Sequence, residues 1–308
     1  MIIDIRYHIA SLVAVFLALA IGILIGTSLL GNEAIVEQQK QLTDRMEADL
    51  ALLRQENQEV QTILTNYEKT TGVYQQFAKD ILPLLVHQRL SGKNIAIVDT
   101  SNYGFNEDLI AALEEAGSKV TTFTTVLPAF ELADQGKKQF IIDYFALEQS
   151  SVPEVVDFLV DEVVRSLMIG DNLAVLNFLE EQNMLKKGGE YGVPLDAVIV
   201  IGGSSDQEFA SDRIAIIDRP LLDKLSATGL GVYGVEHRDV PFSYMSEYQK
   251  YKISTVDNVD TAIGQVALVW AIEGKAGDYG VKTTAKNLLP DYEVPTRETE
   301  RAGVQGGS

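Results

Sequence analysis

The sequence contains no cysteine, which excludes disulfide bonds, thiolate metal sites and cysteine nucleophiles together. Basic residues are also scarce, because 25 Lys and Arg stand against 44 Asp and Glu, and the formal charge is −19. Nucleic acid is bound by clustered Lys and Arg that release its counterions, so no nucleic-acid partner is expected. An exported domain of this size needs no disulfide, so the lack of cysteine leaves the compartment open.

Ligands for a metal ion are few. The chain has three histidines, His8, His87 and His237, which lie far apart in sequence, and only five methionines. Copper(I) prefers soft thiolate and thioether ligands, so this composition argues against a copper site. Met245 lies eight residues from His237 in a stretch that resembles a loop. His237 and Met245 are therefore weak metal candidates, and no cofactor is expected.

One long apolar run is present. Residues 9–30 read IASLVAVFLALAIGILIGTSLL and carry no charge. About 20 apolar residues cross a hydrocarbon core roughly 30 Å thick. A cleaved signal peptide would have an apolar region of about 7–15 residues and a small-residue cleavage site, which this run does not match. We predict a transmembrane helix over 9–30. Because Arg6 precedes it, the positive-inside rule places residues 1–8 in the cytoplasm and residues 31–308 outside it.

Five small residues recur at every fourth position of this span and form a stripe along one helix face. Such a stripe allows a second helix to approach closely, although Ala and Gly are also common in single membrane helices. We predict that the stripe is a helix-packing face. Its members are Ala10, Ala14, Ala18, Gly22 and Gly26.

Residues 31–82 are rich in Gln, Glu, Leu and Asp, which is typical of a long helix. With Met46 at position a, a heptad pattern predicts a parallel homodimeric coiled-coil stalk. Asp49 and Glu56 then occupy d positions, so the seam either shifts toward Leu50 or loosens in the middle. A helix that lies against its own domain is the alternative. Pro83 is expected to end or kink the helix. The predicted seam contains Leu42, Met46, Leu53, Val60, Ile63 and Tyr67.

Residues 92–280 alternate short apolar runs with helical patterns, which predicts an α/β domain with a doubly wound, mainly parallel sheet. Strands are expected at residues 94–99, 119–126, 197–201 and 230–235. The helix after the first strand has Asn106 as its N-cap and Gly117 just past its end. Residues 281–308 are polar and are expected to form a disordered tail.

Three further helices are expected in this domain. Two lie between residues 153 and 185, with the second beginning at Asp171. The last begins at Asp257 or Asn258, ends at Gly274, and buries Ile263, Val266, Ala267 and Trp270. The first of these helices places one apolar face toward the core, formed by Val156, Leu159, Val160, Val163 and Leu167.

Ligands of open α/β sheets bind beyond the carboxyl ends of strands, which nominates residues 99–101, 202–205 and 236–237. Gly202 and Gly203 lack the spacings of the dinucleotide-binding and P-loop motifs. The segment Gly202-Gly203-Ser204-Ser205-Asp206 also lacks the G-x-S-x-G nucleophile elbow of hydrolases. We therefore expect no catalytic residue, and the chain is not predicted to be an enzyme.

The N-terminus, IDIRYHIASLVAVFLALAIGILIGTSLL, closely resembles the start of bacterial proteins of the MctB family of copper transporters, which includes the SteB proteins of actinobacterial cell separation. The stretches DAVIVIGG, VDNVDTAIGQVALVWAIEGKAGDYGVK and NLLP are similar to the same family. The resemblance covers most of residues 3–290. It implies a single-pass protein of the bacterial plasma membrane that takes part either in copper efflux or in the control of cell-wall hydrolases with a SteA-type partner.

A single transmembrane helix cannot line a polar transport path alone, because its lipid-facing residues leave no continuous hydrophilic surface. We therefore expect a scaffold that presents a dimeric coiled coil and an α/β domain to a cell-envelope or cell-separation partner. The alternative is a component of copper transport or efflux, as the family name implies.

Overall fold

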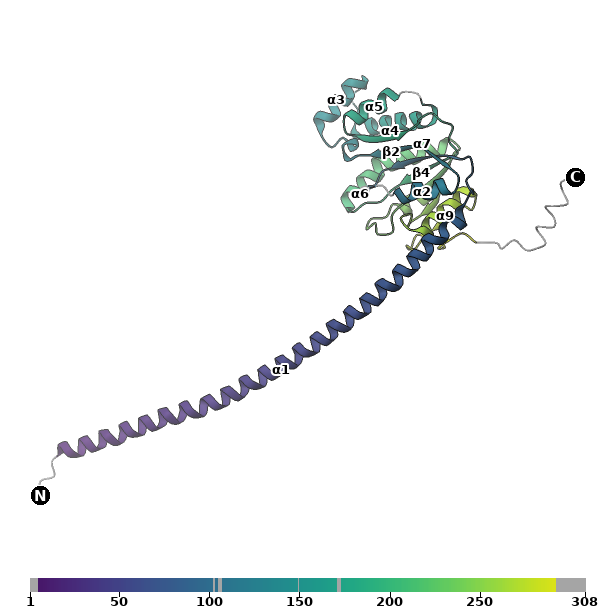
Figure 1. Ribbon diagram of the computed structural model, residues 1–308. Coiled ribbons are helices and arrows are strands. Elements are labelled where there is room, and N and C mark those ends of the chain that lie inside the picture. Colours follow the sequence, from purple (N-terminus) through teal and green to yellow (C-terminus); the bar gives the residue numbers. More distant parts are fainter. Residues whose placement is uncertain (1–4, 102, 105–106, 149, 171–172, 292–308) are drawn as a thin grey trace, which may run out of the picture. The chain divides into compact units, whose positions relative to one another are not determined.

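The structure is a computed structural model that describes residues 5–101, 103–104, 107–148, 150–170 and 173–291 (Figure 1). It divides into two compact units, one that ends at Val73 and one that begins at Tyr74. The predicted N-cap Asn106, the predicted helix start Asp171 and residues 292–308 of the predicted tail lie outside the described residues.

Helix α1 (Ile5–Val86) is one uninterrupted helix of 82 residues. Its first part, Ile5–Ser28, is long and apolar enough to cross a membrane, in agreement with the span predicted at 9–30. Pro83 lies inside α1, so of the two expected effects, an end or a kink, the helix does not end there. The carbonyl that loses its partner belongs to the exposed residue Lys79 and is open to water, and His87 N donates to Pro83 O at 2.9 Å one turn later.

The second unit contains a seven-stranded sheet in the order β3-β2-β1-β4-β5-β6-β7. Neighbouring strands are parallel except for β2 and β3, which are antiparallel. This confirms the predicted doubly wound, mainly parallel sheet. The strands are β1 (Asn94–Asp99), β2 (Lys119–Val126), β3 (Leu185–Gly189), β4 (Ala197–Ile201), β5 (Gly231–Val235), β6 (Ser254–Val256) and β7 (Asp278–Tyr279).

Helices cover both faces of the sheet (Figure 1). One face carries α2 (Glu107–Glu115), α9 (Ala262–Glu273) and the end of α1. The other carries α3 (Gln135–Phe145), α4 (Val152–Ile169), α5 (Leu173–Glu181), α6 (Gln207–Arg213), α7 (Arg219–Ala227) and α8 (Met245–Tyr248). Three short segments complete the unit: η1 (Pro128–Glu131), the π-helical η2 (Ile214–Asp218) and η3 (Gln249–Tyr251).

The alternation of side chains along each central strand explains the two layers of helices. In β1, Ala96 and Val98 belong to one buried cluster, whereas Ile95 and Ile97 belong to the other. Successive side chains of a strand point to opposite faces, so a strand covered on both sides is apolar throughout. The predicted apolar face of α4 is buried in the first cluster, which confirms that prediction.

The last helix differs from its predicted form at its start. Helix α9 begins at Ala262, and the side chain of Thr261 caps it by accepting a hydrogen bond from Gly264 N at 3.1 Å. The expected start at Asp257 or Asn258 is therefore wrong, because these residues form the turn that follows β6. Ile263 is 37% exposed and is not part of the core. The other three predicted core residues of this helix are buried, and Gly274 caps its end as expected.

Helix α9 also holds the end of α1. Trp270 Nε1 donates to Leu85 O at 3.1 Å, and the Arg89 guanidinium contacts the Glu273 carboxylate at 2.8 Å. Arg89 and Lys275 each place their charged group 4.9 Å from the centre of the Trp270 ring. A hydrogen bond, cation–π contacts and a partly buried ion pair thus connect the end of α1 and the turn after it to α9.

The chain after β7 packs back on the domain. Val281 N and Lys282 N donate to the two carboxylate oxygens of Asp257 at 2.7 and 2.9 Å. Gly280 N donates to Asn287 O at 3.0 Å. Within the described range 281–291, the segment is thus hydrogen-bonded to the sheet, and the domain extends beyond the predicted boundary at 280.

Candidate functional site

The three segments nominated from the sequence meet at one edge of the sheet. Asp99, Ile201 and Val235 are register partners across β1, β4 and β5, so the residues that follow them lie side by side. From β1 the chain crosses to β2 on one side, and from β4 it crosses to β5 on the other. This reversal between β1 and β4 is the position where doubly wound sheets bind ligands.

Aromatic side chains fill the space above the glycine pair. A Cβ atom on Gly202 would lie 2.8 Å from Tyr244 Cδ2 and would also collide with the hydroxyl of Tyr248. Gly203 has a φ of +106°, and a Cβ there would meet Val240 Cγ1 at 2.8 Å. These glycines therefore serve close packing of side chains, and the backbone beneath them is covered by the chain itself.

A buried polar network lies beneath these aromatic rings. Thr100 Oγ1 donates to Asp218 Oδ1 at 2.7 Å, and the Tyr248 hydroxyl donates to the same oxygen. Asp218 is fully buried, and this burial raises the pKa of its carboxyl from 3.8 to about 6. Its second oxygen, Oδ2, is buried and has no hydrogen-bond partner among the residues described.

The guanidinium of Arg213 connects this network to the end of β2 and to η1. It donates to the carbonyl oxygens of Thr100 and Val126 and to Glu131 Oε1, the last at 2.6 Å. Arg213 is 1% exposed and lies directly before the π-helical segment η2, which ends at Asp218. A π-helical turn places residues five apart above one another, so it brings Arg213 and Asp218 to one face of the helix.

Two further polar side chains are incompletely satisfied at this edge. Asp99 Oδ1 accepts hydrogen bonds from Ser101 N at 2.9 Å and Ser101 Oγ at 2.7 Å. Burial raises the pKa of the Asp99 carboxyl above its usual value. Asp99 Oδ2 and His237 Nε2 are buried without a partner in the described part of the chain, and the His237 ring lies 6.1 Å from the Tyr103 ring.

Glu236, also nominated from its position, is fully occupied by the domain. Its carboxylate accepts hydrogen bonds from Lys282 Nζ at 2.8 Å, Ser243 Oγ at 2.6 Å and Tyr244 N at 2.9 Å. Its side chain has no exposed area, and burial raises the pKa of its carboxyl. Lys282 therefore already neutralises the Glu236 carboxylate, which is not free to bind a cation from outside the domain.

The structure separates the environments of the two weak metal candidates. Met245 begins α8, whereas the sequence suggested a loop, and it is 1% exposed in the apolar core beside Tyr248. His237 follows β5 at the polar edge of the sheet. Met184 lies in the turn after α5 and is also buried. In the described ranges, no group of three or more His, Asp or Glu side chains is placed to hold a metal ion.

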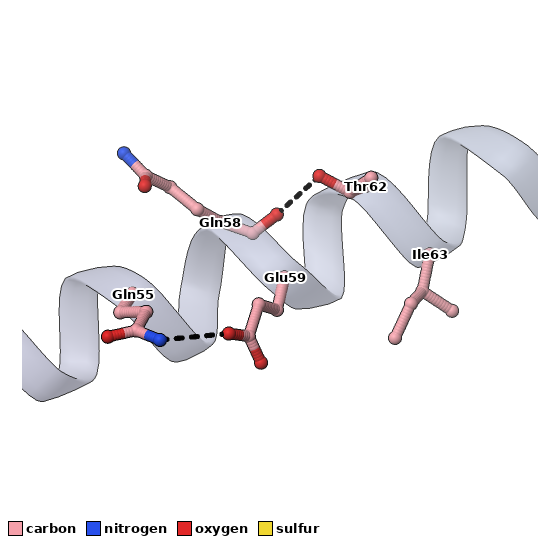
Figure 2. Close-up of a pocket in the computed structure, with 5 residues that line it drawn as sticks. All are labelled: Gln55, Gln58, Glu59, Thr62 and Ile63. Atoms are coloured by element: carbon pink, nitrogen blue, oxygen red, sulfur yellow. Dashed lines mark hydrogen bonds between the residues drawn. The ribbon is translucent and has the colours of Figure 1, made fainter.

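Helix α1 offers the second candidate surface. The predicted seam residues Leu42, Met46, Leu53, Val60, Ile63 and Tyr67 are between 53% and 73% exposed. Figure 2 shows the stretch of this helix from Gln55 to Ile63, where Gln55 Nε2 donates to Glu59 Oε1 at 3.0 Å. The hollow drawn there is lined by one helix alone and has no opposite wall. The helix surface is thus suited to contact with another chain rather than to enclosing a small ligand.

The packing stripe predicted in the membrane span lies on the same helix. A Cβ atom built on Gly22 or Gly26 would meet no heavy atom within 4 Å. The stripe is therefore open to a second helix in the described structure, and its role in packing stays a prediction.

A comparison with protein families places nearly the whole chain in one match. The matching family model is described as "Copper transport outer membrane protein, MctB" and covers residues 2–290. No curated protein matches the chain.

Proposed function

The chain belongs to the MctB family of copper transport outer membrane proteins, and we propose that within the cell envelope it acts as a membrane-anchored scaffold rather than as an enzyme. The family relates the chain to copper transport, and the apolar start of α1 indicates a membrane anchor. In the proposed role, two copies pair through α1 and present their α/β domains outside the cytoplasm to a cell-envelope partner, such as a SteA-type cell-separation protein.

The observation that carries this proposal is the continuity of α1. One helix without a break contains the apolar segment Ile5–Ser28, the exposed apolar side chains of the stalk, and a last turn that Trp270 of α9 binds at Leu85. A partner that binds the α/β domain is thereby connected to a membrane anchor by regular structure. The sheet edge where other doubly wound domains bind ligands is largely occupied by this domain's own tyrosines and by Lys282.

The orientation can be tested with single cysteines, because the natural chain has none. Glu114 is exposed on α2, and Tyr7 is 83% exposed before the span. In intact spheroplasts, a membrane-impermeant maleimide should label Glu114→Cys and should label the matched control Tyr7→Cys only after lysis. Protease added outside should also remove the α/β domain. Labelling of Tyr7→Cys alone before lysis would show that the orientation is reversed.

The partner can be tested by affinity purification of the full-length protein from solubilised membranes, with metal analysis of the same sample. A scaffold should retain a cell-envelope protein in constant proportion and contain no stoichiometric copper. The matched control carries Leu53→Asp and Val60→Asp, which place unpaired charges in the seam and should reduce pairing. Stoichiometric copper without a retained protein would contradict the scaffold.

A copper transport role is the second candidate, because the family description itself names it. His237, with its unpartnered buried Nε2 in the described residues, and Met245 are the ligand types that copper(I) accepts. We expect the full-length protein and a His237→Ala, Met245→Leu double variant to bind copper(I) equally weakly against a competing chelator. Tight, stoichiometric binding that the double variant loses would favour the transport role over the scaffold.

A further inference from the structure

The exposed apolar residues of the stalk follow a more regular seam than the heptad that begins with Met46 at position a. Starting at Met46 and alternating steps of four and three residues, every position is uncharged. Alternating steps of four and three are the spacing of the a and d positions of a coiled coil. The seam consists of Met46, Leu50, Leu53, Asn57, Val60, Leu64, Tyr67, Thr71 and Tyr74.

This spacing removes the two acidic residues from the contact. Asp49 and Glu56, which occupied d positions before, become g residues that flank the seam, and Ile63 also moves to a g position. The upstream residue Leu42 joins the seam through two successive steps of four, from Leu42 to Met46 and on to Leu50. Two successive steps of four form a stutter, which locally unwinds the supercoil without interrupting the contact.

The structure fits this seam. Helix α1 is continuous through the whole region, and Leu50 and Leu64 are 50% and 49% exposed. Asn57 is exposed on the same stripe. The polar residues of Figure 2 lie on the outer positions b, c and f, where Gln55 and Glu59 bond to each other along the helix. Large apolar side chains this exposed gain free energy when a second surface covers them, at about 25 cal/mol per Å².

We propose that α1 pairs with a second copy of this chain, parallel and in register, through this seam, with Asn57 facing Asn57 of the partner subunit. This inference rests on the proposed function, because two chains anchored in one membrane with the same orientation must run parallel. A single Asn at an a position lowers stability but specifies a two-stranded, in-register pair, because each amide can bond to its counterpart.

Charge complementarity supports the same partner. In a parallel pair, a g residue lies near the e residue five positions later on the other helix. Asp49 at g therefore faces Arg54 of the partner subunit at e, and Arg54 faces the partner's Asp49. The same acidic residue that would break the seam at a d position thus contributes an ion pair across it. In this register the sequence complements itself, which favours a second copy as the occupant of this surface.

Asn57→Val tests the specifying role of the amide. Val is compatible with an a position but no longer favours a single register or number of strands. In the full-length protein, the variant should form pairs that resist heating better, together with species larger than a dimer on chemical crosslinking. Dimers alone, with unchanged resistance to heating, would overturn the role of Asn57.

Single cysteines decide the register in full-length protein in native membranes. A disulfide requires Cα atoms about 4.4–6.8 Å apart, a condition met at a and d positions but not at g. On mild oxidation, Leu64→Cys should form a crosslinked dimer and the adjacent Ile63→Cys should not. Leu53→Cys, which lies in the seam in either register, is the matched control. Crosslinking of Ile63→Cys without Leu64→Cys would overturn the register and leave the proposed dimer intact, whereas no crosslink at any of the three would refute the dimer itself.

Discussion

The buried carboxyl of Asp218 predicts that the stability of the α/β domain falls as the pH rises toward neutrality. Its pKa is about 6 in the folded domain against 3.8 for an ordinary Asp. Between these values the folded state keeps the proton that the unfolded chain has released. The stability from this group is fully present below pH 3.8 and is lost as the pH rises through 6. Protonation also leaves Arg213 and Glu131 as a balanced pair, whereas the ionised group adds an excess negative charge.

The magnitude follows from proton linkage. The full shift of about 2 pKa units corresponds to about 3 kcal/mol, and the part expressed between pH 5 and pH 7 is about 1 kcal/mol. This range stays above the sequence pI of about 4.5, where the protein carries little net charge. Asp99 and Glu236 have pKa values raised in the same direction, so the contribution of Asp218 is isolated by comparison with a variant.

Asp218→Asn is the matched variant, since its amide oxygen can still accept the hydrogen bonds of Thr100 and Tyr248 but the side chain does not titrate. Urea unfolding of the detergent-solubilised chain can be followed by the fluorescence of Trp270, the single tryptophan, which is 3% exposed in the core. The free energy of unfolding of the natural protein, relative to the variant, should decrease by about 1 kcal/mol from pH 5 to pH 7. A difference that stays constant, or that increases with pH, would refute the reasoning.

Three variants and one control test the packing, the polar network and the stalk. Gly202→Ala should destabilise the domain by about 1–3 kcal/mol in urea unfolding, because the added methyl collides with buried tyrosines, whereas Gly188→Ala, with open space around its Cβ, should cost far less. Arg213→Met should cost about 3–5 kcal/mol, because it leaves a carboxylate and two carbonyl oxygens without their donor, and an unfolding midpoint equal to that of the natural protein would contradict the network. Leu53→Asp with Val60→Asp should shift the detergent-solubilised protein from dimer to monomer in light scattering, and a natural protein that is already monomeric would remove the basis for that expectation.

The sequence predicted the central elements because their signals are local. The run AVIVI is apolar on both faces and cannot be stable outside a covered sheet, so β4 was identified to the residue. The antiparallel β3 was missed, since LKKGG has two lysines and two glycines and its strand form depends on pairing with β2. Strands β6 and β7 were also missed, because three and two residues are too few to show a strand pattern in the sequence.

The position of the polar edge of the sheet was predicted, but several of the side chains that form it were not. Residues 99–101, 202–205 and 236–237 follow strands, which is visible in the sequence, and the structure brings them together. Arg213, Asp218 and Tyr248 were not predicted, because their burial depends on a π-helical turn and on contacts between residues 30 to more than 100 positions apart. The only local signal was the pair Gly202 and Gly234, whose lack of a side chain leaves room for the ring of Tyr248.

Because Lys282 lies late in the sequence, the fold of the domain can be completed only after nearly all of it has been synthesised. Glu236 has no exposed area, and its ammonium partner follows it by 46 residues, after α9 and β7. During translation the carboxylate of Glu236 is therefore made before its counterion, and it has no Lys282 partner until almost the whole domain has been synthesised. Until then, protonation or contact with water must stabilise that edge, since an unpaired buried charge is costly. The assembly of the sheet is thus finished from its carboxyl-terminal end, and a chain truncated before Lys282 would retain every central strand while its edge remained open.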